Sequence, residues 1–201
     1  MISFPKEYVG LSSQIRKYWS DYGGVLVLVR SPFAHISLII AMSSYRVWMD
    51  QKWVDIPLSL LPNLLGFSLG AYALIFSLTN ERLLAALHTP TSDGSPTHLG
   101  AINATFFHFI LMQTIAIIYA LANKSTLIID AVILLPFSCE FKKTTTNVLS
   151  SAAGLFGYFL TVYAIVLLIG AAIAVYRMTT LSASAARKAQ GQAKSLSPNR
   201  D

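Results

Sequence analysis

Residues 56–80 read IPLSLLPNLLGFSLGAYALIFSLTN, and this stretch decides the fold of the chain. It contains no charged residue and is longer than the roughly 20 helical residues that cross a bilayer core. Six of its residues follow one another at spacings of four and three, which places them on one face of a helix. These residues, which we call the α-small stripe, are Ser59, Asn63, Gly66, Gly70, Ala73 and Ser77.

A face of small residues favours close packing of helices in lipid. Hydrophobic drive between helices is weak there, so close backbone approach and hydrogen bonds hold them together. The last apolar stretch of the chain repeats the spacing, with Gly154 and Gly157 as its smallest members. Two interpretations are open and compatible: the stripes pack within one bundle, or one of them faces a second subunit.

The composition agrees with a membrane protein. The 201 residues are 54% hydrophobic and only 12% charged, and the mean hydropathy is +0.57. Soluble domains carry about 25% charged residues. A single cysteine, Cys139, excludes an intramolecular disulfide. We therefore predict an all-α integral membrane protein.

The apolar stretches predict a four-transmembrane-helix bundle over residues 24–178. An N-terminal lead, residues 1–23, is expected to hold an amphipathic helix over 8–23 that lies at the membrane interface, because its apolar and aromatic residues recur at helical spacing. Residues 179–201 are basic and are predicted to be a flexible tail beyond a turn or two. The four spans are expected near residues 24–45, 56–78, 101–122 and 149–176.

Residues 127–137 are apolar but too short to span a membrane as a helix. They are interrupted by Asp130 and end near Pro136. An extension of the third helix or an interfacial helix is the favoured interpretation, and a re-entrant turn is the alternative.

Charge placement predicts the orientation. With both termini in the cytoplasm, nine lysines and arginines lie in the segments expected inside and five in those expected outside, leaving Arg30 aside. This bias follows the positive-inside rule. We expect an integral protein of a bacterial inner membrane. The net charge of +6 is spread over flanking segments, so no nucleic-acid partner is expected.

Polar residues within the apolar stretches are the remaining candidates for function. Such side chains are costly in lipid and usually face protein or water. They are expected to form interhelical hydrogen bonds or, as the alternative, to carry protons or ions. His108 and Gln113 are separated by about 140° around a helix, which argues against one continuous polar lining. The candidates are His35, Asn103, His108, Gln113 and Asp130.

The sequence predicts no enzyme, cofactor or metal site, since it lacks HExxH, GxSxG and phosphate-loop patterns. The leading hypothesis is a self-associating membrane assembly that senses or alters the bilayer, as a stress or phage-defence component would. Its expected partners are the lipid bilayer, further copies of the chain and a cytoplasmic protein acting on residues 79–100. The alternatives are an ion or proton pore and a membrane immunity protein that blocks a toxin.

Overall fold

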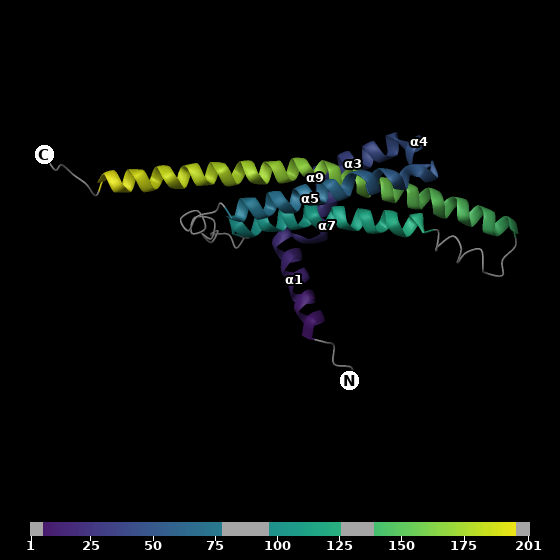
Figure 1. The fold of residues 1–201 in the computed structure, drawn as a ribbon, viewed down its shortest axis with the longest axis horizontal. Helices are drawn as coiled ribbons and strands as arrows, with labels where there is room; N and C mark the ends of the chain where they lie inside the picture. The colour runs from purple at the N-terminus through teal and green to yellow at the C-terminus, as the bar shows by residue number, and fades with distance from the viewer. Residues whose placement is uncertain (1–5, 78–96, 126–138, 196–201) are drawn as a thin grey trace. The chain divides into compact units, whose positions relative to one another are not determined.

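The computed structural model describes residues 6–77, 97–125 and 139–195 (Figure 1). Within these ranges the chain is almost entirely helical and contains no strand. Four stretches are long and apolar enough to cross a membrane, which confirms the all-helical class and the number of apolar stretches. They are Ser12–Ser43, Lys52–Ala73, Leu99–Lys124 and Glu140–Thr180.

The N-terminal part of the described chain, which includes the candidate span Ser12–Ser43, is a series of shorter helices. The helices are α1 Lys6–Tyr22, α2 Gly24–Arg30, α3 Pro32–Ser43 and α4 Tyr45–Trp48. Gly23 and Gly24 have φ of 97° and 76°, a region that other residues rarely adopt, and they separate α1 from α2. Ser31 is extended, as the residue before a proline tends to be. The span predicted over residues 24–45 thus overlaps the apolar stretch Ser12–Ser43, in which the helix is interrupted at Ser31.

The remaining helices are longer. A 3-10 turn, η1 Gln51–Val54, leads into α5 Asp55–Ser77, followed by α7 His98–Lys124 and α9 Cys139–Ser195. The prediction that helix ends within a turn or two of Thr179 is wrong, because α9 continues to Ser195. This segment is rich in alanine, lysine, arginine and glutamine, which have high helix propensity.

Some predicted features lie outside the described residues. They are the apolar segment 127–137 with Asp130, most of the 79–100 connection, and the last residues of the tail.

The chain divides into two compact units, each described here by itself. The first unit comprises residues 1–24, 72–107 and 169–201, and the second comprises residues 25–71 and 108–168. The core of the second unit joins α5, α7 and α9 through Leu61, Ala116, Leu160 and Ala164, each at most 4% exposed. Two alanines in this core let the helices approach closely.

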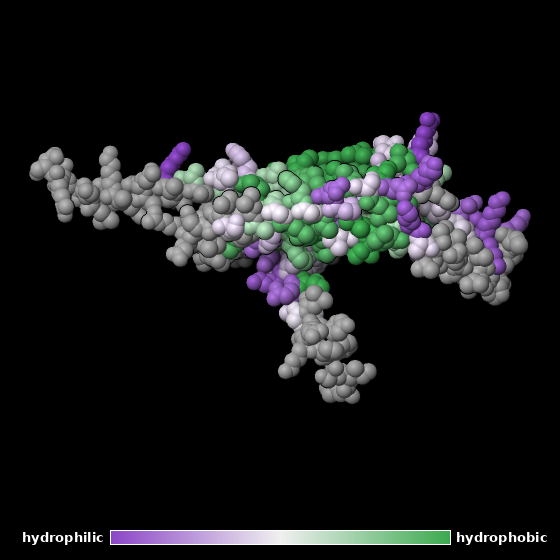
Figure 2. Space-filling view, in the orientation of Figure 1, coloured by the Kyte–Doolittle hydropathy of each residue, from purple (hydrophilic) through white to green (hydrophobic). Residues whose placement is uncertain are grey.

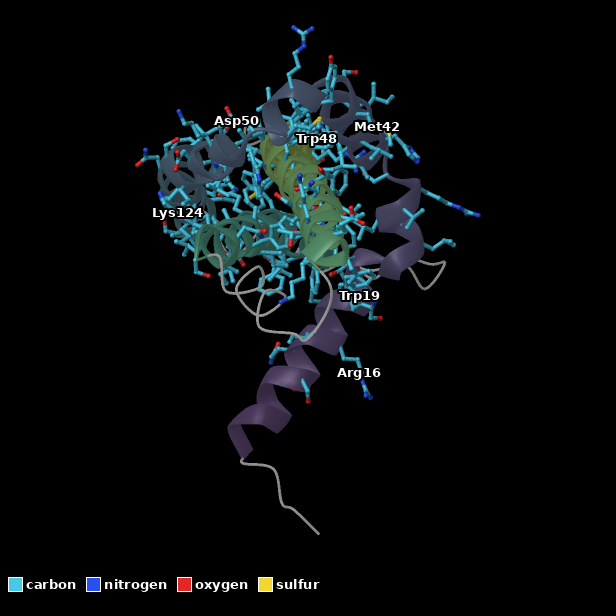
Figure 3. All side chains as sticks on the ribbon, turned by 90° about the vertical axis from the view of Figure 1, so that its right-hand side faces the viewer. Arg16, Trp19, Met42, Trp48, Asp50 and Lys124 are labelled. Carbon is cyan, nitrogen blue, oxygen red and sulfur yellow. The ribbon has the colours of Figure 1, made fainter. Side chains whose placement is uncertain are left out.

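The outer surface of the second unit is strongly apolar. On α3, Ser37 and Ala41 are buried, whereas Ile36, Ile39 and Met42 are exposed. Figure 2 shows the apolar residues gathered over the helices, with hydrophilic residues near α4 and η1. Trp48 closes the corner after α3 by donating its indole N–H to the Ala41 carbonyl at 2.8 Å. Met42 and Trp48 are labelled in Figure 3.

In the first unit, α1 packs on α7 through an aromatic contact. The rings of Tyr18 and Phe107 meet edge to face with centroids 4.8 Å apart, and Tyr18 is buried. Arg16 and Trp19 of the same helix are exposed (Figure 3). A helix is therefore present where the amphipathic segment is predicted, and the buried Tyr18 anchors it on α7.

Candidate functional site

The α-small stripe lies on the open side of α5. All six of its residues are exposed, and a Cβ placed on Gly66 or Gly70 would meet no atom within 4 Å. The buried residues of α5, which include Pro57, Leu61 and Ser68, lie on the opposite side of the helix. The prediction that this stripe packs within the bundle is therefore wrong for the described residues.

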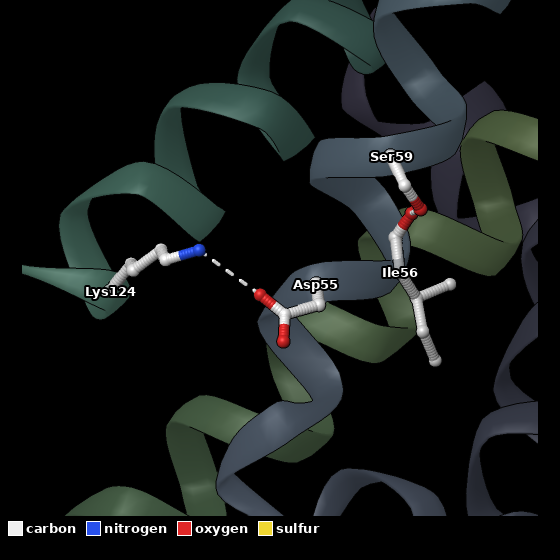
Figure 4. Close-up of polar contacts among 4 residues, drawn as sticks. All are labelled: Asp55, Ile56, Ser59 and Lys124. Atoms are coloured by element: carbon white, nitrogen blue, oxygen red, sulfur yellow. Dashed lines mark hydrogen bonds and ion pairs between the residues drawn. The ribbon is translucent and has the colours of Figure 1, made fainter.

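The polar members of the stripe bond to their own helix. Ser59 donates to the Ile56 carbonyl at 3.1 Å (Figure 4), and the Asn63 amide donates to the Ser59 carbonyl at 3.4 Å. Pro62 precedes Asn63 and carries no N–H for the helix ladder. These local bonds keep the side chains close to the helix backbone, so the residues of the stripe project only a short distance from α5.

The glycines of α9 have the opposite environment. Gly154 and Gly157 are buried. A Cβ on Gly154 would overlap the backbone carbonyl oxygen of Trp48, and a Cβ on Gly157 would overlap the indole ring of Trp53. Only glycine leaves room for these contacts, so this part of the small-residue pattern serves packing inside the second unit.

Gln113 is a fully buried polar residue at the contact between α7 and α5. Its amide nitrogen donates to the Ser68 hydroxyl at 3.2 Å, and that hydroxyl donates to the Leu64 carbonyl at 2.6 Å. The Gln113 amide oxygen is buried and has no hydrogen-bond partner among the described residues. A buried acceptor without a partner costs free energy, about 1–3 kcal/mol.

His108 connects α7 to α9 in the same unit. Its Nε2 lies 2.9 Å from the Tyr163 hydroxyl, and the Tyr163 ring stacks on Phe159 with an interplanar angle of 7°. His108 is 2% exposed. His108 and Gln113 therefore bond to different helices, and each has a structural role in joining two helices.

The other predicted polar residues are dispersed. In the first unit, the Asn103 amide oxygen accepts a hydrogen bond from the Tyr72 hydroxyl at 3.3 Å. His35 is exposed on α3. No group of three or more histidine, cysteine, aspartate or glutamate side chains is placed to hold a metal ion within the described ranges.

An exposed ion pair joins the start of α5 to the end of α7. The Lys124 ammonium lies 3.1 Å from an Asp55 carboxylate oxygen (Figure 4). The two side chains are 58% and 62% exposed. Exposed pairs contribute about 0–1 kcal/mol, so this contact contributes little to the stability of the fold.

Sequence reasoning missed the partners of these residues. Trp48 and Trp53 both lie against glycines of α9, and no spacing in the sequence marks this contact. Ser68, Tyr72 and Tyr163 have no signal in the sequence that marks them as hydrogen-bond partners, because each pairing depends on which helices are neighbours.

Comparisons of the chain with protein-family models, with curated proteins and with solved structures found no match.

Proposed function

We propose that this chain is an integral membrane protein that self-associates through the α-small stripe. The single observation that supports this most is that all six residues of the stripe are exposed on α5 while the comparable glycines of α9 are buried. The open space at Gly66 and Gly70 would let a second helix approach closely, and close approach is the main source of helix association in lipid.

Membrane insertion is supported by the surface. Large apolar side chains are exposed on several helices, with Val29 at 62%, Ile39 at 65% and Phe67 at 70%. Continuous exposed apolar surface of this kind is rare on soluble monomers, and lipid tails are its natural solvent. The excess of basic residues in the N-terminal lead and the tail supports a cytoplasmic location for both termini.

Asn63 gives the proposed interface a polar contact. Its side chain uses one N–H on its own helix, which leaves its second N–H and its oxygen for a neighbouring copy. Amide hydrogen bonds between helices in a membrane contribute about 0.6–2 kcal/mol. A two-fold interface would bring Asn63 close to its own counterpart.

Such an assembly would respond to the bilayer. Association through the small-residue face competes with lipid contacts, and a mismatch between helix length and bilayer thickness shifts that balance by fractions of a kcal/mol per Å. We therefore propose that the functional change is a shift in subunit packing, which a change in membrane state produces.

The test is the size of the assembly in lipid nanodiscs for Gly70→Ile. A β-branched side chain at this position would keep a second helix at a distance, so we expect the association constant to fall at least tenfold. The helical content should be unchanged, because Gly70 has open space around it. Leu60→Ile is the matched control, since Leu60 is exposed on α5 about 100° from the centre of the stripe. Unchanged association in Gly70→Ile would refute the proposal.

A further inference from the structure

The first unit contains a cavity that the proposed self-association does not use. It has a volume of about 630 Å³ and is lined by residues of α1, α5 and α7, together with Thr97 just before α7. Pockets that hold small ligands have volumes of about 300–1,000 Å³. The cavity is therefore large enough for a lipid headgroup and part of the glycerol backbone.

One wall carries two opposite charges on a single helix. Gln14, Lys17 and Asp21 of α1 line the cavity at spacings of three and four, which places them on one face. Neither Lys17 nor Asp21 makes an ion pair or a hydrogen bond with another described side chain. The cavity thus presents an ammonium and a carboxylate about one helical turn apart, neither of them paired within the described ranges.

The facing wall is neutral and contains both polar and aromatic groups. Tyr72 and Asn103 line it and hydrogen-bond each other at 3.3 Å. Phe107 lines it beside Tyr18, and their edge-to-face contact holds α1 at this wall. A ligand here would meet fixed amide and hydroxyl groups on one side and apolar surface next to them.

We propose that this cavity binds the headgroup of an aminophospholipid of the phosphatidylethanolamine type. The lipid phosphate would lie against Lys17, and the primary ammonium would donate to Asp21. One zwitterionic ligand can form charge-assisted hydrogen bonds with both the Lys17 ammonium and the Asp21 carboxylate. An anionic lipid would bring no partner for the carboxylate.

The lipid, rather than a free headgroup, is favoured by the surroundings of the cavity. Ile15 and Trp19 are exposed on α1, and Trp side chains prefer the headgroup layer of a bilayer. Phe107 is 45% exposed at the wall of the cavity, which provides apolar surface for the acyl chains. The inference rests on membrane insertion, and it does not depend on association through α5.

The test is a titration of the purified full chain in detergent, read by native mass spectrometry. The probe is phosphatidylethanolamine with palmitoyl and oleoyl chains. We expect Lys17→Gln and Asp21→Asn each to weaken binding about tenfold. Arg16→Gln, on the same helix but outside the cavity lining, and Glu140→Gln on α9 are the matched controls and should bind as the parent chain does.

Two comparisons with other lipids make the result decisive. Phosphatidylglycerol with the same chains should bind at least tenfold more weakly, because it lacks the ammonium. Phosphatidylcholine should also bind more weakly, because its quaternary nitrogen cannot donate to Asp21. Equal binding of either lipid, or no effect of Asp21→Asn, would overturn the proposal.

A further arm uses soluble glycerophosphoethanolamine. Binding as tight as that of the lipid would overturn the lipid assignment in favour of a free metabolite. Repeating the titration with Gly70→Ile separates the two proposals, since loss of association at α5 should leave lipid binding unchanged.

Discussion

The glycines of α5 and of α9 arise from the same sequence pattern and have opposite environments. Gly66 and Gly70 have no atom near the position of a Cβ, whereas a Cβ on Gly154 or Gly157 would overlap a tryptophan. Small residues at spacings of three and four thus show that a helix can be approached closely. They do not show which helix approaches, because that depends on neighbours far away in the sequence.

The difference follows from whether bulky residues face the glycine pair. The segment after α3 brings Trp48 and Trp53 to α9, where only glycines leave enough space for an indole ring and a backbone carbonyl. No described element covers the stripe of α5. The α9 pair therefore stabilises the second unit, and the α5 pair is accessible to another helix.

The largest expected effect is that of Gly154→Ala. The added methyl group would overlap the Trp48 carbonyl oxygen, and backbone moves less readily than a side chain. We expect the free energy of unfolding in mixed micelles to fall by about 3 kcal/mol, the upper part of the range for overpacking. Gly66→Ala is the matched control and should be neutral or stabilising, because alanine has the higher helix propensity. Equal effects of the two changes would remove the distinction between the glycine pairs.

A smaller effect is expected for the polar residues on the two sides of α5. Ser68→Ala removes the hydrogen bond that the Gln113 amide donates and leaves that buried amide with no partner among the described side chains. The expected loss of stability is about 1 kcal/mol. Asn63→Ala, on the exposed side, should change the stability of the dissociated subunit by less than about 0.5 kcal/mol. Thermal unfolding of protein that is highly diluted in detergent, so that subunits are dissociated, measures both effects. A larger effect of Asn63→Ala would contradict the assignment of the two faces.

The smallest effect is expected for Lys124→Gln. It removes the exposed ion pair with Asp55, and screened pairs of this type contribute little. We expect a change below about 0.5 kcal/mol, which disappears in high salt. A change above 1 kcal/mol would show that the end of the second unit depends on this contact more than on the tryptophan–glycine packing.

The sequence predicts the helices better than their partners. Length and apolar composition define α5 and α7 within a few residues, because a bilayer core sets the length of a span. The break at Ser31 has a signal in Pro32. The sequence does not predict that α9 continues beyond Thr179. The charged and small residues there resemble those of a disordered tail, although most of these residue types have high helix propensity.

The contacts of the site are harder to predict for a physical reason. His108 bonds Tyr163 across 55 positions of sequence, and Gln113 bonds Ser68 across 45. Periodicity shows that these residues lie on helices at depth, and it contains no information on helix order. The same limit explains why the sequence predicts the stripe of α5 as a packing face and leaves open whether it faces the bundle or a second subunit.

The central claim is that the exposed face of α5 contacts a second copy of the chain, and cysteine cross-linking in native membranes tests it most directly. The chain has one cysteine, so Cys139→Ser provides a background for single cysteines along α5. We predict that Ser59→Cys, Gly66→Cys and Gly70→Cys form disulfide-linked dimers on mild oxidation, and that Leu61→Cys and Ser68→Cys on the buried side do not. Cross-linking of the buried positions alone, or of none of the five, would contradict the account.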